Sequence, residues 1–183
     1  MMYDYWYWED FYSSAEIKEL HHIFHKTKHN QTEDEPAENT KKNLNLTFSR
    51  WKNFKDNLTS LEQNILITNS EKFGYNIWPQ YDNNDLLLNE YDSAVKGQYD
   101  WHFDGSNNHT YDIKYTILIN ASLESYKGGQ FYLFSNGGPK HVKELDKPGN
   151  VVMFKSHLHH KVNPVTSGKR HSISIFYKGP RFI

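Results

Sequence analysis

The residue pattern changes at Leu86, and this change limits the folds that the chain can adopt. From there onward the sequence consists of short runs rich in Val, Ile, Tyr and Phe, separated by Gly, Asn and Pro. Runs of this kind favour strands, and the residues between them favour turns. The C-terminal half is therefore predicted to be all β, with its clearest strands at Tyr115–Asn120, Gln130–Phe134, Asn150–Phe154 and His171–Tyr177.

The segment before Leu86 predicts two helices and a loop. Ser13 and Glu16 have the spacing of a capping box, and apolar residues follow at helical spacing to about His25. Residues 27–43 contain almost no apolar side chain, so we expect a solvated loop there.

A second helix is predicted where Thr59 and Glu62 repeat the capping-box pattern, and Gly74 stands at its expected C-terminal cap. Helices followed by many short strands predict a mainly β, α+β domain spanning residues 1–183, with helices on one face of a β-sandwich or jelly roll.

Composition narrows the classes of function. The formal net charge is −1 and the basic residues are scattered, which disfavours a nucleic-acid partner. Without cysteine, a transition metal must be bound by His and carboxylate. The aromatic and acidic N-terminus does not resemble a signal peptide, and no segment approaches transmembrane length, so we expect a cytoplasmic protein, of a cell or of a viral host, that does not bind membranes.

Two segments far apart in the chain contain candidate metal ligands. On a strand, His102 and Asp104 would lie on one face, although roughly 1.3 such His-x-acid pairs are expected by chance in this composition. A distant cluster adds His160, which shares its strand face with Val162 and should therefore point inward, whereas His157 and His159 should point outward. Two His and one carboxylate form the facial triad of Fe(II) oxygenases.

Arg170 follows this cluster on another predicted strand. Its planar guanidinium can hold a carboxylate through two parallel hydrogen bonds, which suits the far end of a dicarboxylate. Ser172 has the same parity and would add one hydroxyl contact, although a serine in a strand commonly has no such role. A surface ion pair is the alternative interpretation of Arg170.

These residues together resemble the prolyl 4-hydroxylase family of 2-oxoglutarate- and Fe(II)-dependent dioxygenases, especially its PKHD-type members, over roughly residues 86–178. One matching motif contains Tyr91, Gly97, Tyr99, His102 and Asp104. The other contains Phe154, Ser156, His160, Val162, Pro164, Val165, Gly168 and Arg170.

The resemblance implies a double-stranded β-helix that uses Fe(II), 2-oxoglutarate and O2, with ascorbate as a reductant. It implies that His102, Asp104 and His160 bind the metal and are catalytic. Arg170 would bind the C5 carboxylate of 2-oxoglutarate, with Tyr91, Ser172 and Tyr99 as further contacts. Collagen-type relatives have lysine at the position of Arg170, and Leu118 stands where oxygen-sensing relatives have a second tyrosine.

The resemblance also implies a peptide or protein substrate. Peptidyl proline is the first candidate, and another protein side chain or a free amino acid is the alternative. Aromatic side chains suit a proline-rich ligand. The candidates for substrate contact are Trp101, the loop Gly105–Tyr111 and the aromatic N-terminus, whose rings could instead cover a sheet edge.

Other classes of function stay open on the sequence alone. A zinc hydrolase can also use two His and one Asp, but the chain has no HExxH segment. A catalytically inactive cupin-like binding protein would keep the fold, and the triad with Arg170 argues against it. An AlkB-like nucleic-acid demethylase shares the core but would need a basic surface.

Overall fold

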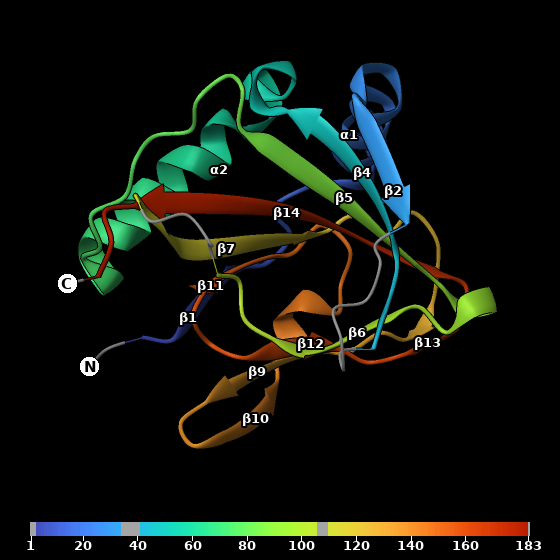
Figure 1. Cartoon of the computed structure of the whole chain (residues 1–183). Coiled ribbons are helices and arrows are strands. Elements are labelled where there is room, and N and C mark those ends of the chain that lie inside the picture. Colours follow the sequence, from blue (N-terminus) through green and yellow to red (C-terminus); the bar gives the residue numbers. More distant parts are fainter. Residues whose placement is uncertain (1–2, 34–40, 106–109, 183) are drawn as a thin grey trace.

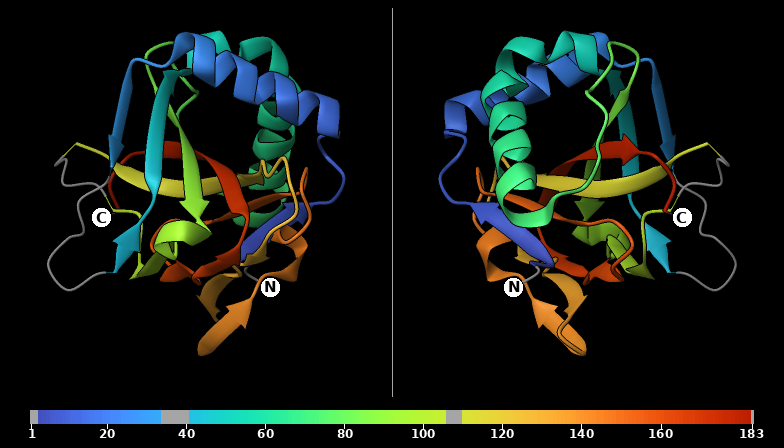
Figure 2. Two further views of the ribbon diagram at one scale, coloured as in Figure 1. Left: turned by 90° about the vertical axis from the view of Figure 1, so that its right-hand side faces the viewer. Right: turned by 90° about the vertical axis from the view of Figure 1, so that its left-hand side faces the viewer.

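Two antiparallel β-sheets face each other, and the helices cover the outer side of the larger sheet (Figures 1 and 2). The computed structural model describes residues 3–33, 41–105 and 110–182. Within these residues the major sheet has the order β1-β11-β7-β14-β5-β4-β2, the minor sheet has the order β10-β9-β12-β6-β3, and β13 pairs with β8.

The major-sheet strands are β1 (Tyr5–Trp8), β2 (Asn30–Glu33), β4 (Asn45–Arg50), β5 (Asp85–Asp92), β7 (Asp112–Asn120), β11 (Val151–Lys155) and β14 (Lys169–Gly179). The other strands are β3 (Lys42–Asn43), β6 (Gln98–His102), β8 (Lys127–Gly128), β9 (Phe131–Ser135), β10 (Gly138–His141), β12 (His160–Val162) and β13 (Val165–Ser167). Short 3-10 helices lie at Trp51–Asn53, Ser93–Val95 and Lys143–Leu145. The prediction of a mainly β jelly roll with helices on one face is confirmed.

Helix α1 (Ser14–Thr27) begins at the predicted capping box. The Ser13 side chain accepts a hydrogen bond from the backbone N–H of Glu16, and the Glu16 carboxylate accepts one from the backbone N–H of Ser13. The buried face of the helix carries Ile17, Leu20 and Phe24 into the core between the helices and the major sheet. No helix in the described part of the chain is both long and apolar enough to span a bilayer.

Helix α2 (Lys55–Thr68) begins earlier than the sequence predicted. The second capping box is wrong, because Thr59 lies one turn inside the helix and donates its hydroxyl to the carbonyl of Lys55. The fully buried Phe54 occupies the N-cap position instead. At the other end a π-helical turn, Asn69–Phe73, continues the helix. Gly74 then ends it in the left-handed region at φ 72°, as predicted.

The prediction of a loop over residues 27–43 is wrong at both ends of that range. Strand β2 pairs with β4 at the edge of the major sheet, and β3 pairs with β6 at the edge of the minor sheet. An edge strand pairs through its backbone hydrogen bonds, so a segment without apolar residues can still extend a sheet. Residues 34–40 lie outside the described part of the chain.

The aromatic N-terminus forms β1, which pairs with β11 at the other edge of the major sheet. Trp8 packs against the core below the helices, whereas Tyr5 packs against the core between the two sheets. This placement matches the alternative that these rings cover a sheet edge, and none of them lines the cavity described below.

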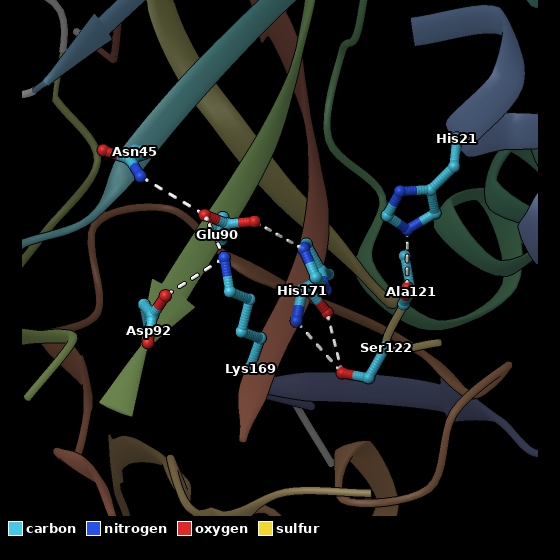
Figure 3. A network of polar contacts seen from close by, with 8 residues as sticks. All are labelled: His21, Asn45, Glu90, Asp92, Ala121, Ser122, Lys169 and His171. Atoms are coloured by element: carbon cyan, nitrogen blue, oxygen red, sulfur yellow. Dashed lines mark hydrogen bonds and ion pairs between the residues drawn. The ribbon is translucent and has the colours of Figure 1, made fainter. Parts of the chain in front are cut away.

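A polar network occupies the helix side of the major sheet near the start of β14 (Figure 3). His171 binds the carboxylate of Glu90 at 3.1 Å, and Glu90 also accepts from Asn45 and Lys169. His21 of α1 is 5 % exposed, and its Nε2 lies 2.8 Å from the carbonyl oxygen of Ala121. The rings of His21 and His171 meet edge to face, with centroids 5.0 Å apart.

We predict that His21 makes the stability of the fold depend on pH. Burial lowers its pKa below 6.5, while the bond to Ala121 and the charge of Glu90 act in the opposite direction and His171 and His25 act with burial. Because the folded state binds fewer protons, the contribution of His21 to stability is fully present above pH 6.5. It is lost progressively as the pH falls from the unfolded pKa through the lower folded pKa.

His21→Gln keeps a donor for Ala121 and cannot titrate. The unfolding free energy of the wild type should therefore fall more steeply than that of the variant between pH 7.5 and 5.5, by at most about 1.4 kcal/mol per pH unit. Urea denaturation across this range measures the slopes. The exposed His22→Gln serves as the control and should keep the wild-type slope. Equal slopes for His21→Gln and the wild type would contradict the prediction.

Candidate metal centre

His102 and His160 face each other across the pairing of β6 with β12. Their ring centroids are 4.1 Å apart. Asp104 lies two residues beyond the end of β6, with its carboxylate 3.4 Å from Nε2 of His160 and 4.0 Å from Nε2 of His102. One ligand atom from each of the three residues lies within 4.8 Å of the others, so the group can hold a single metal ion.

Both imidazoles are held in the tautomer that a metal requires. Nδ1 of His102 lies 2.7 Å from the carbonyl oxygen of Asp100, and Nδ1 of His160 lies 2.9 Å from that of Leu158. A carbonyl oxygen only accepts, so each Nδ1 carries the hydrogen and each Nε2 keeps its lone pair toward Asp104.

Burial favours the uncharged form of every group in the triad. It lowers the pKa of His102 to about 4, with repulsion from His160 as the next cause, and it lowers the pKa of His160 to about 4. It also raises the pKa of Asp104, against a hydrogen bond from Thr116 that lowers it. Neutral imidazole is the form that binds metals, and a cation between these groups would favour the ionised carboxylate. The donor set therefore fits Fe(II).

Two hydroxyl residues orient Asp104: Thr116, which the sequence reasoning missed, and Ser156, which it named only as part of a motif. Thr116 of β7 donates its hydroxyl to Oδ2 of Asp104 at 2.5 Å, and the hydroxyls of Thr116 and Ser156 are 3.1 Å apart. The backbone N–H of Asp104 donates to the carbonyl of Ser156 at 2.9 Å. Thr116 stands within an apolar run, and its polarity at an inward-facing position was the available signal.

A β-bulge in β6 decides which side chains face the metal centre. His102 pairs with His160, but the next pair along is Tyr99 with Val162, so β6 contains one extra residue. Tyr99 and His102 therefore share the inner face, where their rings stack with centroids 3.4 Å apart. Trp101 packs against Phe134 and Lys161 and does not line the cavity, so the structure does not bring this predicted substrate residue to the triad.

The other predicted residues lie as follows. His157 and His159 are exposed, and the ring of His159 contacts that of Phe103. Of the predicted loop Gly105–Tyr111, residues 106–109 lie outside the described part of the chain.

A cavity of about 150 Å³ adjoins the triad between the two sheets. Its wall combines apolar residues with a polar row on the inner face of β5 and β14. The lining residues outside the triad are Lys42, Leu44, Leu46, Leu87, Asn89, Tyr91, Tyr99, Thr116, Leu118, Phe131, Val162, Ser172, Ser174 and Phe176. Tyr91, Ser172 and Tyr99, all predicted as cosubstrate contacts, line this cavity, the first two from the major sheet and Tyr99 from the minor sheet.

Arg170 is buried beside this cavity, with 1 % of its surface exposed. Its Nη1 donates to Oγ of Ser172 at 3.3 Å, and its guanidinium lies 5.3 Å from the ring centroid of Tyr91. Burial raises the pKa of Tyr91 to about 12, so the phenol stays neutral. Among the described residues Nη2 of Arg170 has no hydrogen-bond partner and no carboxylate pairs with the guanidinium. A buried cation without a counter-ion is costly, so this arrangement fits an anionic ligand.

Comparisons with known proteins agree with this geometry. A family model described as the 2OG-Fe(II) oxygenase superfamily, where 2OG is 2-oxoglutarate, matches residues 86–178. A PKHD-type hydroxylase of Synechococcus sp. (strain CC9605) is 34 % identical over 82 residues, which cover 43 % of this chain and 36 % of that protein. The chain thus spans about a third of the length of this curated relative.

Solved structures share the fold. A prolyl-4-hydroxylase of Pseudomonas putida has a TM-score of 0.70 at 16 % identity, covering 98 % of this chain and 94 % of that chain. A prolyl hydroxylase of Trichoplax adhaerens, in complex with a hypoxia inducible factor peptide fragment, has a TM-score of 0.68 at 16 % identity and covers 95 % and 83 %. At these identities the likeness establishes the fold.

The family model covers just over half of the 183 residues and includes the whole triad and Arg170. The resemblance predicted from the two motifs is thereby confirmed, and the chain belongs to the 2OG-Fe(II) oxygenase superfamily.

Proposed function

We propose that this protein is a 2-oxoglutarate- and Fe(II)-dependent dioxygenase that hydroxylates prolyl residues in a peptide or protein. One observation carries the proposal. Two neutral histidines and Asp104 converge at a cavity beside which a buried arginine has no counter-ion within the described part of the chain. A metal cation would bind the two histidines and Asp104, and an acidic cosubstrate would pair with the arginine.

In this proposal His102, His160 and Asp104 hold Fe(II), which with 2-oxoglutarate and O2 supplies the oxidising power to hydroxylate an unactivated C–H bond. The overall reaction converts 2-oxoglutarate, O2 and R–H into succinate, CO2 and R–OH. Thr116 fixes the Asp104 carboxylate, and the carbonyls of Asp100 and Leu158 keep both imidazoles in the ligating tautomer. These contacts hold the three ligands ready before the metal arrives.

Arg170 would bind the distal carboxylate of 2-oxoglutarate with its Nη2, for which the described residues provide no acceptor. The remaining wall keeps water away from the reacting atoms, because it is built from apolar residues of the core between the sheets. The apolar residues of this wall are Leu44, Leu46, Phe131, Leu118 and Val162.

The prolyl substrate is supported by the names of the relatives. The matched structures include a prolyl-4-hydroxylase, a viral collagen prolyl hydroxylase of Paramecium Bursaria Chlorella virus-1 in complex with 2OG, and a prolyl hydroxylase bound to a peptide. Each of these proteins is named for hydroxylating proline. Hydroxylation of another protein side chain or a free amino acid would use the same metal centre.

His160→Ala tests the metal centre. Without one of three ligands, iron binding and 2-oxoglutarate turnover should each fall by at least about 100-fold. Iron binding is measured by anaerobic titration, and succinate production gives turnover. The matched control is His159→Ala, which removes the exposed neighbour and should keep both properties. If the wild type binds no iron and produces no succinate, the inactive binding protein becomes the better interpretation.

Arg170→Met tests the cosubstrate site. Loss of a buried charged partner costs about 2–5 kcal/mol, so KM for 2-oxoglutarate should rise by at least about 30-fold. The ligand-free variant should be as stable as the wild type or more so, because an uncompensated buried cation has been removed. Lys169→Met, which alters an exposed lysine paired with Glu90 and Asp92, is the control for KM. An unchanged KM in Arg170→Met would contradict the assignment.

Proline-rich peptides test the substrate class. Incubation with Fe(II), 2-oxoglutarate and O2 should add one oxygen atom to the peptide and raise succinate production above the level without peptide. Mass spectrometry locates the added oxygen. Peptides in which alanine replaces each proline should remain unmodified. Modification of both peptide sets at other residues would identify a different side chain as the target.

A further inference from the structure

The inner face of β5 and β14 carries a polar row that the metal chemistry leaves unexplained. Asn89 lies opposite Ser172 in the pairing of these strands, and Ser174 follows on the same face. All three line the cavity and are at most 6 % exposed. Asparagine is disfavoured in strands, and a buried amide is costly unless its hydrogen bonds are made.

The orientation of the Asn89 amide follows from its contact with the backbone. Its Nδ2 lies 3.1 Å from the carbonyl oxygen of Ser172. A carbonyl oxygen only accepts hydrogen bonds, so the NH2 group and not the amide oxygen must face it. The same NH2 group donates to Oγ of Ser174 at 2.8 Å and, more weakly, to Oγ of Ser172 at 3.4 Å.

These contacts determine the direction of every hydrogen bond in the row. Oγ of Ser172 receives N–H groups from Asn89 and from Arg170, and Oγ of Ser174 receives one from Asn89. A hydroxyl that accepts in this way keeps its own O–H for another acceptor. The wall therefore presents two hydroxyl donors, and that of Ser172 adjoins the Arg170 guanidinium, whose Nη2 has no partner among the described residues. Such a set suits a ligand group that only accepts, which is a carboxylate.

We infer that Asn89 is a positioning residue for the cosubstrate: it holds Ser172 and Ser174 as donors and thereby selects a 2-oxo acid with a second carboxylate. The inference rests on the proposed function and deepens it. Asn89 acts through the two serines and need not contact the ligand itself.

The test compares two acids of equal chain length, 2-oxoglutarate and 2-oxopentanoate, which lacks the second carboxylate. Dissociation constants are measured anaerobically by calorimetry on the Fe(II)-loaded protein. In Asn89→Leu, which removes the donor, the preference for 2-oxoglutarate should fall about 10-fold. In Asn89→Asp, of nearly the same shape, the carboxylate would accept both hydroxyl protons and repel the ligand. Its preference should fall at least about 100-fold.

A merely structural role would change the affinities for both acids alike, so an unchanged ratio in both Asn89 variants would overturn the inference. Asn150→Asp is the control for burying a carboxylate, because Asn150 is 2 % exposed and lies outside the cavity wall, and it should keep the wild-type ratio. If Asn89→Asp does not fold, Ser174→Ala removes one of the two hydroxyl donors and should lower the preference in the same direction.

Failure of the proposed function gives a different result from failure of this inference. A wild type that binds neither acid in the presence of Fe(II) would overturn both. A wild type that prefers 2-oxoglutarate, with Asn89 variants that share its preference, would overturn only the role of Asn89.

Discussion

The pairing of β14 with both β5 and β7 is the interaction on which the rest of the structure depends. This strand is eleven residues long and lies inside the major sheet, so its side chains alternate between two buried surroundings. Ile173, Ile175 and Tyr177 face the helices, whereas Arg170, Ser172 and Ser174 face the second sheet. A shift of one residue would exchange the two sets and place the arginine in the apolar core. The network of Glu90, Lys169 and His171 on the helix side favours the observed register (Figure 3).

A site arranged in this way lowers the stability of the ligand-free fold. Arg170 is buried and has no counter-ion among residues 3–33, 41–105 and 110–182, and burial lowers the pKa of both histidines while it raises that of Asp104. Each of these groups would be better solvated in an unfolded chain. The apolar contacts of the two core clusters must compensate for this. A ligand that binds only the folded state would return part of the lost stability.

The sequence predicted the site better than it predicted the N-terminal half. Strand parity alone placed His160 inward and His159 outward, because an inward-facing Val162 fixes the parity of its strand. Local pattern also located α1 and Gly74. Local pattern did not locate the start of α2, because the buried Phe54 occupies the N-cap position that was expected for Thr59. It failed again for β2 and β3, since edge pairing needs only backbone groups.

Other features depend on contacts between distant segments and leave little trace in local sequence. The bulge that brings Tyr99 beside His102 arises from the register of β6 against β12. Thr116 and Asn89 gain their roles only when the fold places them against Asp104 and Ser172. Their polarity within apolar runs was a signal, but the partner of each could not be inferred.

The cavity is chemically asymmetric along its length, and this asymmetry explains why two ligands are needed. The triad end presents imidazole lone pairs and a carboxylate, which attract a cation. The wall of Ser172 and Ser174 beside Arg170 presents hydrogen-bond donors and a positive charge, which attract an anion. A divalent metal and a dicarboxylate balance each other in charge. Binding both ligands therefore adds no net charge to the interior, whereas binding either one alone leaves a charge without a partner in a region of low polarity. This balance favours a dicarboxylate over a monocarboxylate as the companion of the metal.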